Sequence, residues 1–448
     1  MTSNAVSQSP TRARLWVLVL LFIAVGLNYM DRANLSLAGG AIQQSEGLSN
    51  VQLGWLLSSS TWAYLAAQIP GGWLLDRFGS QRFYGMMIVL WSIATLAMGF
   101  GGWMTLHLGM SIFTVLLFCR LVMGVAQAPG MPANAKIASM WFPQQERARA
   151  IGAYSTGQYA MTALMMPVLG YLMALYGWPW VFYICGGVGI AFGIYWLCAY
   201  RDPQNSTAAN QAELDYIHQN GGFDTQAAQD TGNEVTWPEI RFVMSHLKFW
   251  GICITQFTTT TILYFFLTWF VTYLEQGLHL PIAQVGVLGS LPYILAAGGV
   301  LFGGVLSDLL YKRGASLVRS RKIPIVSGLF LSSLICVCNF FEHVPALVIV
   351  ILSLAFFTNA YSNQGWTAMS DILPKKMMGT VGGFFNLCGN LAGVCTPIMF
   401  GLFRDMTGNF HGAMYYLTAV ALIGGLSMWL LVPNLDEIEL NQMPNGPH

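Results

Sequence analysis

Twelve apolar segments, each long enough to cross the hydrocarbon core of a bilayer as a helix, constrain this chain more than any other feature. Hydrophobic residues make up 55% of the chain and charged residues only 9%, whereas soluble globular proteins carry about 25% charged residues. The sequence therefore predicts an all-α polytopic membrane protein with twelve transmembrane helices. The segments lie at residues 15–38, 51–75, 83–104, 109–139, 149–174, 179–199, 249–274, 284–310, 323–341, 345–371, 378–402 and 412–432.

A single long polar region, residues 200–248, separates these segments into two groups of six. Its composition predicts a flexible linker with short helical pieces, of which Ala212 to Gln219 is the clearest. The expected domains are a tail at 1–14, a six-helix bundle at 15–199, the linker, a six-helix bundle at 249–432 and a tail at 433–448.

The basic residues predict the orientation in the membrane. Of the twenty Lys and Arg residues, Arg32 and Arg120 lie inside apolar segments, and only Arg404 lies in a connection that would be external. Because positively charged loops stay on the cytoplasmic side, both termini are predicted to be cytoplasmic. The first segment is too long and too polar at its far end for a cleaved signal, so we expect it to act as its own insertion signal.

Two motifs recur in the second half of the chain at nearly the same offset. The stretch from Gly72 to Asp76 recurs in degraded form as Gly304 to Asp308. The stretch from Pro143 to Gly152 is echoed by Pro374 to Gly383, and the two offsets differ by a single position. The two pairs predict a duplicated six-helix unit, with pseudo-symmetric bundles related by an axis along the membrane normal. A ligand site is then expected between the halves near mid-membrane.

The remaining composition argues against several classes of function. The net charge is +1 and no basic or acidic run occurs, so nothing indicates a nucleic-acid partner. No nucleophile motif, metal-spaced histidine cluster or glycine-rich nucleotide loop indicates an enzyme, a metal site or a cofactor. We interpret the eight cysteines, which all lie in apolar segments, as small buried hydrophobic residues. They are Cys119, Cys185, Cys198, Cys253, Cys336, Cys338, Cys388 and Cys395.

The first apolar segment carries Asn28, Tyr29, Asp31 and Arg32 in its second half. An arginine stays charged inside a membrane and needs a compensating anion, either from the protein or from a ligand. On a helix Asn28 and Tyr29 share the face of Arg32, whereas Asp31 points about 100° away. The pattern predicts an anion-binding arginine beside a carboxylate with its own surroundings. A structural ion pair between helices is the alternative.

The connection after the second segment carries Gly72, Asp76, Arg77, Gly79 and Arg82. Gly72 permits close helix packing, Asp76 suits the end of a neighbouring helix, and the arginines can pair with acidic residues or lipid headgroups. We predict that these residues hold one conformation closed. A plain positively charged turn would explain Arg77 and Arg82 but neither the glycines with Asp76 nor their repetition.

The pattern Gly72-x-x-x-Asp76-Arg77-x-Gly79, the twelve segments and the central linker resemble the Major Facilitator Superfamily across essentially the whole chain. Finer motifs resemble its anion:cation symporter family, and within it the bacterial permeases for the sugar acids D-glucarate, galactarate and D-galactonate. These motifs are Asn28-Tyr29-Met-Asp31-Arg32-Ala-Asn34-Leu, Gln68-Ile-Pro70-Gly-Gly-Trp-Leu-Leu-Asp76-Arg77, Trp141-Phe-Pro143 with Glu146-Arg147, and Phe265-Phe-Leu-Thr-Trp269-Phe. The resemblance implies proton-linked import of a sugar acid by alternating access across a bacterial cytoplasmic membrane. We expect a monomer whose partners are the sugar acid, protons and the lipid bilayer.

The resemblance also implies roles for individual residues. Those implied to bind the substrate are Tyr29, Arg32, Tyr64, Gln158, Gln256, Asn363, Trp366 and Asn386, with Tyr29 and Arg32 on the carboxylate and Trp366 on the carbon chain. Asp31 and Arg120 match parts of the proton pathway. The amide side chains agree with a polyol ligand by themselves, because amides donate and accept hydrogen bonds as alcohols do. Each could instead form a hydrogen bond between helices.

Gln127 departs from the family pattern, because the sugar-acid permeases usually carry glutamate at this position. It lies two turns from Arg120 on the same helix face, but glutamine cannot titrate. Three explanations are open: proton coupling through Asp31 alone, uniport or exchange, and an engineered substitution that holds one conformation. A carrier of another organic anion and a non-transporting sensor are further alternatives.

Overall fold

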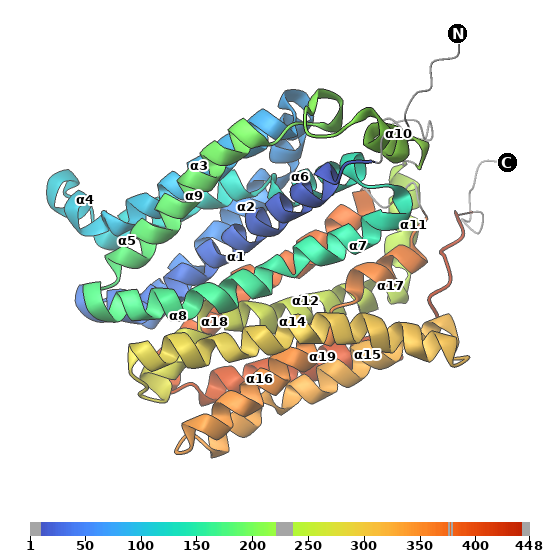
Figure 1. Cartoon of the computed structure of the whole chain (residues 1–448). Coiled ribbons are helices and arrows are strands. Elements are labelled where there is room, and N and C mark those ends of the chain that lie inside the picture. Colours follow the sequence, from blue (N-terminus) through green and yellow to red (C-terminus); the bar gives the residue numbers. More distant parts are fainter. Residues whose placement is uncertain (1–9, 221–235, 375–376, 378–379, 441–448) are drawn as a thin grey trace, which may run out of the picture. The chain divides into compact units, whose positions relative to one another are not determined.

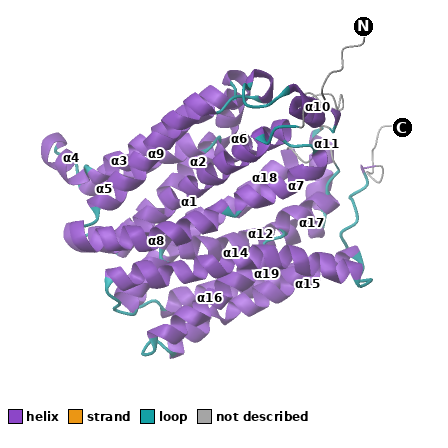
Figure 2. Ribbon diagram, in the orientation of Figure 1, coloured by secondary structure: helices purple, strands orange, loops and turns teal. Residues whose placement is uncertain are grey.

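The computed structural model describes residues 10–220, 236–374, 377 and 380–440 (Figure 1). Every regular element in this part of the chain is a helix (Figure 2). Eleven helical stretches are long and apolar enough to span a membrane, and α2 is a further helix of 29 residues. The all-helical fold class is thereby confirmed. The outer parts of both expected tails, the middle of the expected linker and four residues of the Pro374–Gly383 motif lie outside the described residues.

The helices follow the order of the predicted segments. The first half contains α1 (Ala13–Glu46), α2 (Asn50–Phe78), the π-helix η1 (Ser80–Tyr84), α3 (Gly85–Gly99), α4 (Gly101–Leu108), α5 (Ile112–Gln127), α6 (Gly130–Trp141), α7 (Gln144–Ser155), α8 (Gly157–Tyr176) and α9 (Pro179–Ala199). The expected linker contains η2 (Pro203–Asn205), α10 (Gln211–Gln219) and α11 (Trp237–Ser245). The second half contains α12 (Leu247–Thr268), α13 (Phe270–Thr272), the π-helix η3 (Tyr273–Gly277), α14 (Ile282–Lys312), α15 (Leu317–Ser332), η4 (Ser333–Phe340), α16 (Pro345–Ser362), α17 (Gly365–Ile372), α18 (Thr380–Thr407) and α19 (His411–Leu430). The helix expected at Ala212 to Gln219 is present as α10.

Several predicted helices are interrupted. Segment 109–139 forms α5 and α6, which separate next to Pro129, because proline has no N–H to continue the hydrogen-bond ladder. Segment 345–371 forms α16 and α17, with a break at Gln364, whose side chain donates to the Gly303 carbonyl at 2.8 Å. Segments 83–104, 149–174, 249–274 and 323–341 are also divided, at Phe100, Thr156, Trp269 and Ser333. Four of these six segments still form single stretches that are long and apolar enough to span a membrane, so the breaks are local, and the hydropathy pattern does not predict where they fall.

The packing divides the chain into two compact units that cut across three helices. The first contains Met1–Asp31, Trp62–Met161 and Pro179–Gly232, and the second contains Arg32–Thr61, Thr162–Trp178 and Asn233–His448. The last part of α1, the first part of α2 and the end of α8 therefore pack with the C-terminal helices. The end of the second unit that contains the last part of α1, the first part of α2 and the end of α8 is called the outer end, because the charge pattern predicts that it faces away from the cytoplasm. The division into bundles at 15–199 and 249–432 stays a prediction.

Four glycines bring helices into main-chain contact at the outer end. A Cβ atom at Gly54 of α2 would lie 2.6 Å from a main-chain oxygen of α18, and one at Gly401 of α18 would lie 2.5 Å from a main-chain oxygen of α2. A Cβ atom at Gly170 of α8 would lie 2.8 Å from the Cα atom of Gly286 in α14. Gly286 follows Gly54 at the offset of the first motif pair, and Gly401 follows Gly170 at the offset of the second. The internal repeat therefore relates the contact of α2 with α18 to the contact of α8 with α14.

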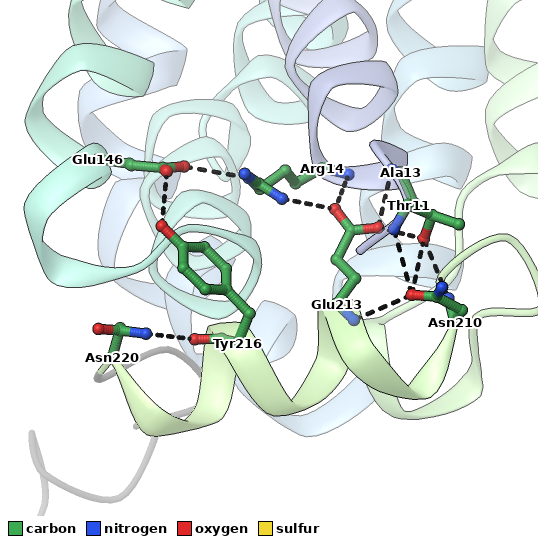
Figure 3. A network of polar contacts seen from close by, with 8 residues as sticks. All are labelled: Thr11, Ala13, Arg14, Glu146, Asn210, Glu213, Tyr216 and Asn220. Carbon is green, nitrogen blue, oxygen red and sulfur yellow. Dashed lines mark hydrogen bonds and ion pairs between the residues drawn. The ribbon is translucent and has the colours of Figure 1, made fainter. Parts of the chain in front are cut away.

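A side chain from the linker helix α10 caps the N-terminus of α1 (Figure 3). The buried Glu213 carboxylate accepts hydrogen bonds from the main-chain N–H groups of Ala13 at 3.0 Å and Arg14 at 3.3 Å. The Arg14 side chain also bridges Glu213 and Glu146 of α7, at 3.0 Å to each. Tyr216 of α10 donates to Glu146 at 2.9 Å. Because the first N–H groups of a helix have no partner within it, this carboxylate stabilises α1 and ties its start to α7.

Candidate functional site

Arg32 lies in the second compact unit and is half-buried in the middle of α1. Its Nη1 donates a hydrogen bond to the Tyr264 hydroxyl of α12 at 3.2 Å, and Thr61 of α2 donates to the same hydroxyl at 3.4 Å. The Tyr264 ring packs directly on Gly393 of α18, where any Cβ atom would overlap it. Because the phenol is neutral, this hydrogen bond orients the guanidinium without neutralising its charge.

Gln256, Thr260 and Tyr264 form a polar stripe along one face of α12. They are spaced one turn apart and cover about 12 Å of the helix axis. Gln256 Nε2 donates to Thr260 Oγ1 at 3.4 Å. A Cβ atom at Gly389 of α18 would lie 2.9 Å from the Gln256 Cγ, and one at Gly365 of α17 would overlap its Oε1. This Oε1 is buried and no described residue donates a hydrogen bond to it, so it can accept one from a ligand hydroxyl.

Asn386 and Trp366 lie on the two elements that contact Gln256. Asn386 of α18 is half-buried, and Asn390 donates to its side-chain oxygen at 3.2 Å. Trp366 of α17 packs edge-on against Phe385 with ring centroids 4.9 Å apart, and 44% of Trp366 is exposed. Asn363 is exposed at the break between α16 and α17. In the second unit, the predicted ligand-binding side chains thus lie on three neighbouring elements, α12, α17 and α18.

Asp31 lies in the first unit and is fully buried. Its carboxylate lies beside Trp91 of α3 and Arg120 of α5, and Arg120 Nη1 donates to the Asp31 carbonyl oxygen at 3.4 Å. Gln127, at the end of α5, is also buried. Asp31 and Arg32 therefore have different surroundings, as the helical spacing predicts. A buried carboxylate beside a guanidinium can gain or lose a proton when its surroundings change.

Tyr29, Tyr64 and Gln158 also belong to the first unit. The α1 and α8 helices approach closely there, since a Cβ atom at Gly157 would lie 2.5 Å from a main-chain oxygen of α1. The adjacent Gln158 is half-buried, and Tyr159 lies near Tyr29. Tyr64 is buried in α2. The predicted substrate-binding residues are thus divided between the units, with Arg32, Gln256, Asn363, Trp366 and Asn386 in the second.

The predicted gating motif surrounds the end of α2. Gly79 ends this helix with a φ of +79°, a conformation that favours glycine. Asp76 forms an ion pair with the Lys136 side chain of α6 at 2.7 Å, so it contacts a neighbouring helix through a side chain. The Arg77 guanidinium lies 5.4 Å from the centroid of the Trp73 ring. Gly72 is half-buried, but a Cβ atom there would meet nothing within 4 Å, which corrects the expectation that this glycine permits close helix packing. Arg82 is exposed. A role of these residues in closure stays a prediction.

Groups of His, Cys, Asp and Glu that could hold a metal ion are absent from the part of the chain that the structure describes. The eight cysteines are free. Cys198 is exposed on α9, which corrects the expectation that all of them are buried. An exposed cysteine on a membrane-spanning helix can face lipid, and this costs little because the thiol behaves as a small apolar group.

A comparison with protein families decides the class of this chain. The family model described as Major Facilitator Superfamily matches residues 21–397. The chain belongs to the Major Facilitator Superfamily. A relative within it is the probable galactarate/D-glucarate transporter GudP of Escherichia coli (strain K12), which is 39% identical over 434 residues and 96% of each chain. The D-galactonate transporter of Escherichia coli O6:H1 is 36% identical over 432 residues, which are 96% of this chain and 98% of that protein.

Two solved structures share the fold of this Major Facilitator Superfamily member. The bacterial homologue of the human lysosomal transporter Spinster, in its inward-facing and occupied form, gives a TM-score of 0.71 at 18% identity and covers 95% of this chain and 97% of that one. The inward open xylose transporter XylE of Escherichia coli gives 0.72 at 14% identity, with 94% and 96% covered. These structures show the twelve-helix fold. The family match and the full-length relatives show that the chain is a multi-pass membrane transporter and not an enzyme.

Sequence reasoning missed two residues around Arg32 in this Major Facilitator Superfamily protein. They are Tyr264, which accepts a hydrogen bond from Arg32, and Thr61, which donates to the Tyr264 hydroxyl. Tyr264 shares a face with Gln256 and Thr260, and that spacing marks a polar stripe. Thr61 gives no comparable signal, because it lies in an ordinary run of small polar residues in α2. Helical spacing shows which side chains share a face but not which helix lies opposite.

Proposed function

We propose that this transporter imports a sugar acid, a hexonate or hexarate such as galactonate, glucarate or galactarate, together with protons across a bacterial cytoplasmic membrane. The observation that carries the proposal is the polar stripe on α12, which runs from the Tyr264 hydroxyl that holds Arg32 to the buried acceptor of Gln256. A guanidinium suits a carboxylate, and amides and hydroxyls suit alcohols. Relatives named for these sugar acids support the substrate class.

In this mechanism Asp31, a buried carboxylate beside Arg120, takes up a proton. The carboxylate of the sugar acid then binds Arg32 and Tyr29, and Tyr64 closes beside it. The alcohols bind the amides, and Trp366 packs against the carbon chain with Asn363 at its side. The amides are Gln158, Gln256 and Asn386.

Closure follows because the bound substrate has a higher affinity for the closed state than for the open one. A substrate with equal affinity for both states would not shift the equilibrium between them. The two halves then rock, the motif from Gly72 to Arg82 loosens, and substrate and proton leave to the cytoplasm.

Arg32→Ala tests the anion-binding role. We expect it to lower sugar-acid uptake by about a hundredfold, because two charge-assisted hydrogen bonds are lost at about 1.5 kcal/mol each. Arg32→Lys should restore only part of the uptake, since lysine cannot bind a carboxylate in a bidentate manner. The measurement is uptake of radiolabelled galactonate, glucarate and galactarate into proteoliposomes.

The matched control is Arg241→Ala, which removes an exposed arginine from α11. It should transport as the unmodified protein does. Size-exclusion chromatography establishes that each variant is folded. Normal uptake by folded Arg32→Ala would refute the anion role.

Exchange or uniport without proton coupling is the second candidate. The burial of Gln127 beside the predicted proton pathway favours it, because an amide cannot carry a proton. Uptake with and without an inward pH gradient separates the two. Accumulation against the substrate gradient requires coupling, whereas exchange gives counterflow alone.

A further inference from the structure

Glu275 is an acidic residue that the proposed mechanism does not use. It lies in η3, beyond the candidate span Leu247–Thr268, and is half-buried at the outer end of the second unit. Its Oε2 is buried, and no described residue donates a hydrogen bond to it. An ionised carboxylate in this position has lost water without gaining a donor, so burial favours the neutral acid.

The last turns of α1 cover Glu275. A Cβ atom at Gly40 would overlap Glu275 Oε2 and would lie 3.0 Å from Gln276 Nε2. The same Nε2 donates to Gln43 of α1 at 3.4 Å. Because Gly40 has no side chain, the ends of the Glu275 and Gln276 side chains can lie against the backbone of α1. Movement of α1 away from η3 would therefore return the carboxylate to water.

The charged groups on neighbouring elements have other partners. Arg404 of α18 donates to the Gln276 side-chain oxygen and lies 4.5 Å from the centroid of the Phe410 ring. Asp405 accepts a hydrogen bond from the main chain at the start of α2 at 3.1 Å. Further titratable groups at this end are the buried Tyr273 of η3, the His411–Glu342 pair, at 3.1 Å, and the exposed Glu46 and His279. Accordingly, burial alone raises the pKa of the Glu275 carboxyl above its ordinary value.

We propose that Glu275 is a further proton-binding site of this carrier and that its protonation favours closure of the outer end. The inference rests on the proposed transport function, because it requires α1 and η3 to separate when the carrier opens outward. In the open state the carboxylate is hydrated and ionised. On closure it takes one proton from the external solution and becomes a neutral acid beneath Gly40.

The direction of the pH dependence follows from the number of bound protons. The closed state binds one proton more than the open state, so closure is favoured at low pH. This preference is lost as the pH rises through the raised pKa of Glu275. A proton carried here would compensate for the one that Gln127 cannot bind.

Hydrogen–deuterium exchange of the purified full chain tests the proposal without any substrate. Peptides from the last turns of α1 are compared at about pH 5.5 and about pH 8, with labelling times scaled for the chemical exchange rate. In the unmodified protein we expect about threefold more protection at the lower pH. Glu275→Gln, which mimics the neutral acid, should give the same high protection at both.

Glu46→Gln is the matched control, because it removes an exposed carboxylate from the same end of α1. It should keep the pH dependence of the unmodified protein. Gly40→Ala adds a methyl group against Glu275 and should lower the protection at the acidic pH. The proposal is overturned if the unmodified protein shows no pH dependence, or if Glu275→Gln retains it. Sugar-acid uptake is measured in parallel, so failure of transport with intact pH-dependent protection would reject only the proposed substrate.

Discussion

At the scale of single residues, Tyr264 orients Arg32, the arginine proposed to bind the substrate carboxylate. Its hydroxyl accepts hydrogen bonds from Arg32 and Thr61, and Tyr264→Phe removes only that oxygen. We expect the KM for galactonate uptake to rise about tenfold, because a hydrogen bond to a charged group contributes about 1.5 kcal/mol or more. The maximal rate should change less, since the guanidinium itself remains. Initial rates in proteoliposomes give both quantities.

Tyr293→Phe is the control for this prediction. Tyr293 is a buried tyrosine of the same unit, and its hydroxyl donates to the Phe266 carbonyl at 2.7 Å. An equal rise in KM for both variants would show that the effect of Tyr264→Phe comes from lost stability rather than from the position of Arg32.

The separate surroundings of Asp31 and Arg32 could be predicted from the sequence, because helical geometry alone turns adjacent side chains about 100° apart. The hydrogen-bond partner of Arg32 could not be predicted in this way. Tyr264 lies far along the chain on α12, and its approach to α1 depends on Gly393, which leaves space for the ring. That dependence is a property of three helices packed together, and no local pattern contains it.

At the scale of elements, the linker helix α10 stabilises the start of α1. We expect Glu213→Gln to lower the apparent melting temperature by about 3 °C, because the amide cannot replace the charged acceptor of Arg14 and of the first N–H groups of α1. Thermal unfolding of the purified protein at one scan rate measures this. Asp215→Asn removes an exposed carboxylate from the same helix and should leave the melting temperature unchanged. Equal effects of both variants would argue against capping.

The positions of the helices could be predicted from apolar runs, but the breaks within them could not. Pro129 carries a local signal for the break between α5 and α6. At the break next to Gln364, Asn363 and Gly365 favour a turn, and the Gln364 side chain donates a tertiary hydrogen bond to Gly303 of α14 that no local pattern predicts. Breaks made by tertiary hydrogen bonds leave hydropathy unchanged, so sequence periodicity does not detect them.

At the scale of the whole molecule, the duplication has left a matched pair of helix contacts at the outer end. The same two offsets that relate the sequence motifs also relate Gly54 to Gly286 and Gly170 to Gly401. Each of these glycines faces main-chain atoms of the opposite helix, which cannot rotate away as a side chain can. Two equivalent close contacts therefore lie at this end, one between α2 and α18 and the other between α8 and α14.

This equivalence makes a prediction about transport. Gly54→Val and Gly286→Val should each lower the rate of sugar-acid uptake at least about tenfold, because the added side chain separates helix backbones that must touch when the outer end closes. Gly298→Val is the control, since a Cβ atom at Gly298 of α14 meets nothing within 4 Å and Gly298 lies outside the repeated motif. Uptake into proteoliposomes by variants of equal yield and size-exclusion profile measures the effect. If Gly54→Val reduced transport and Gly286→Val did not, only the contact between α2 and α18 would be needed for closure. The repeat would then describe a similarity of structure without a similarity of function.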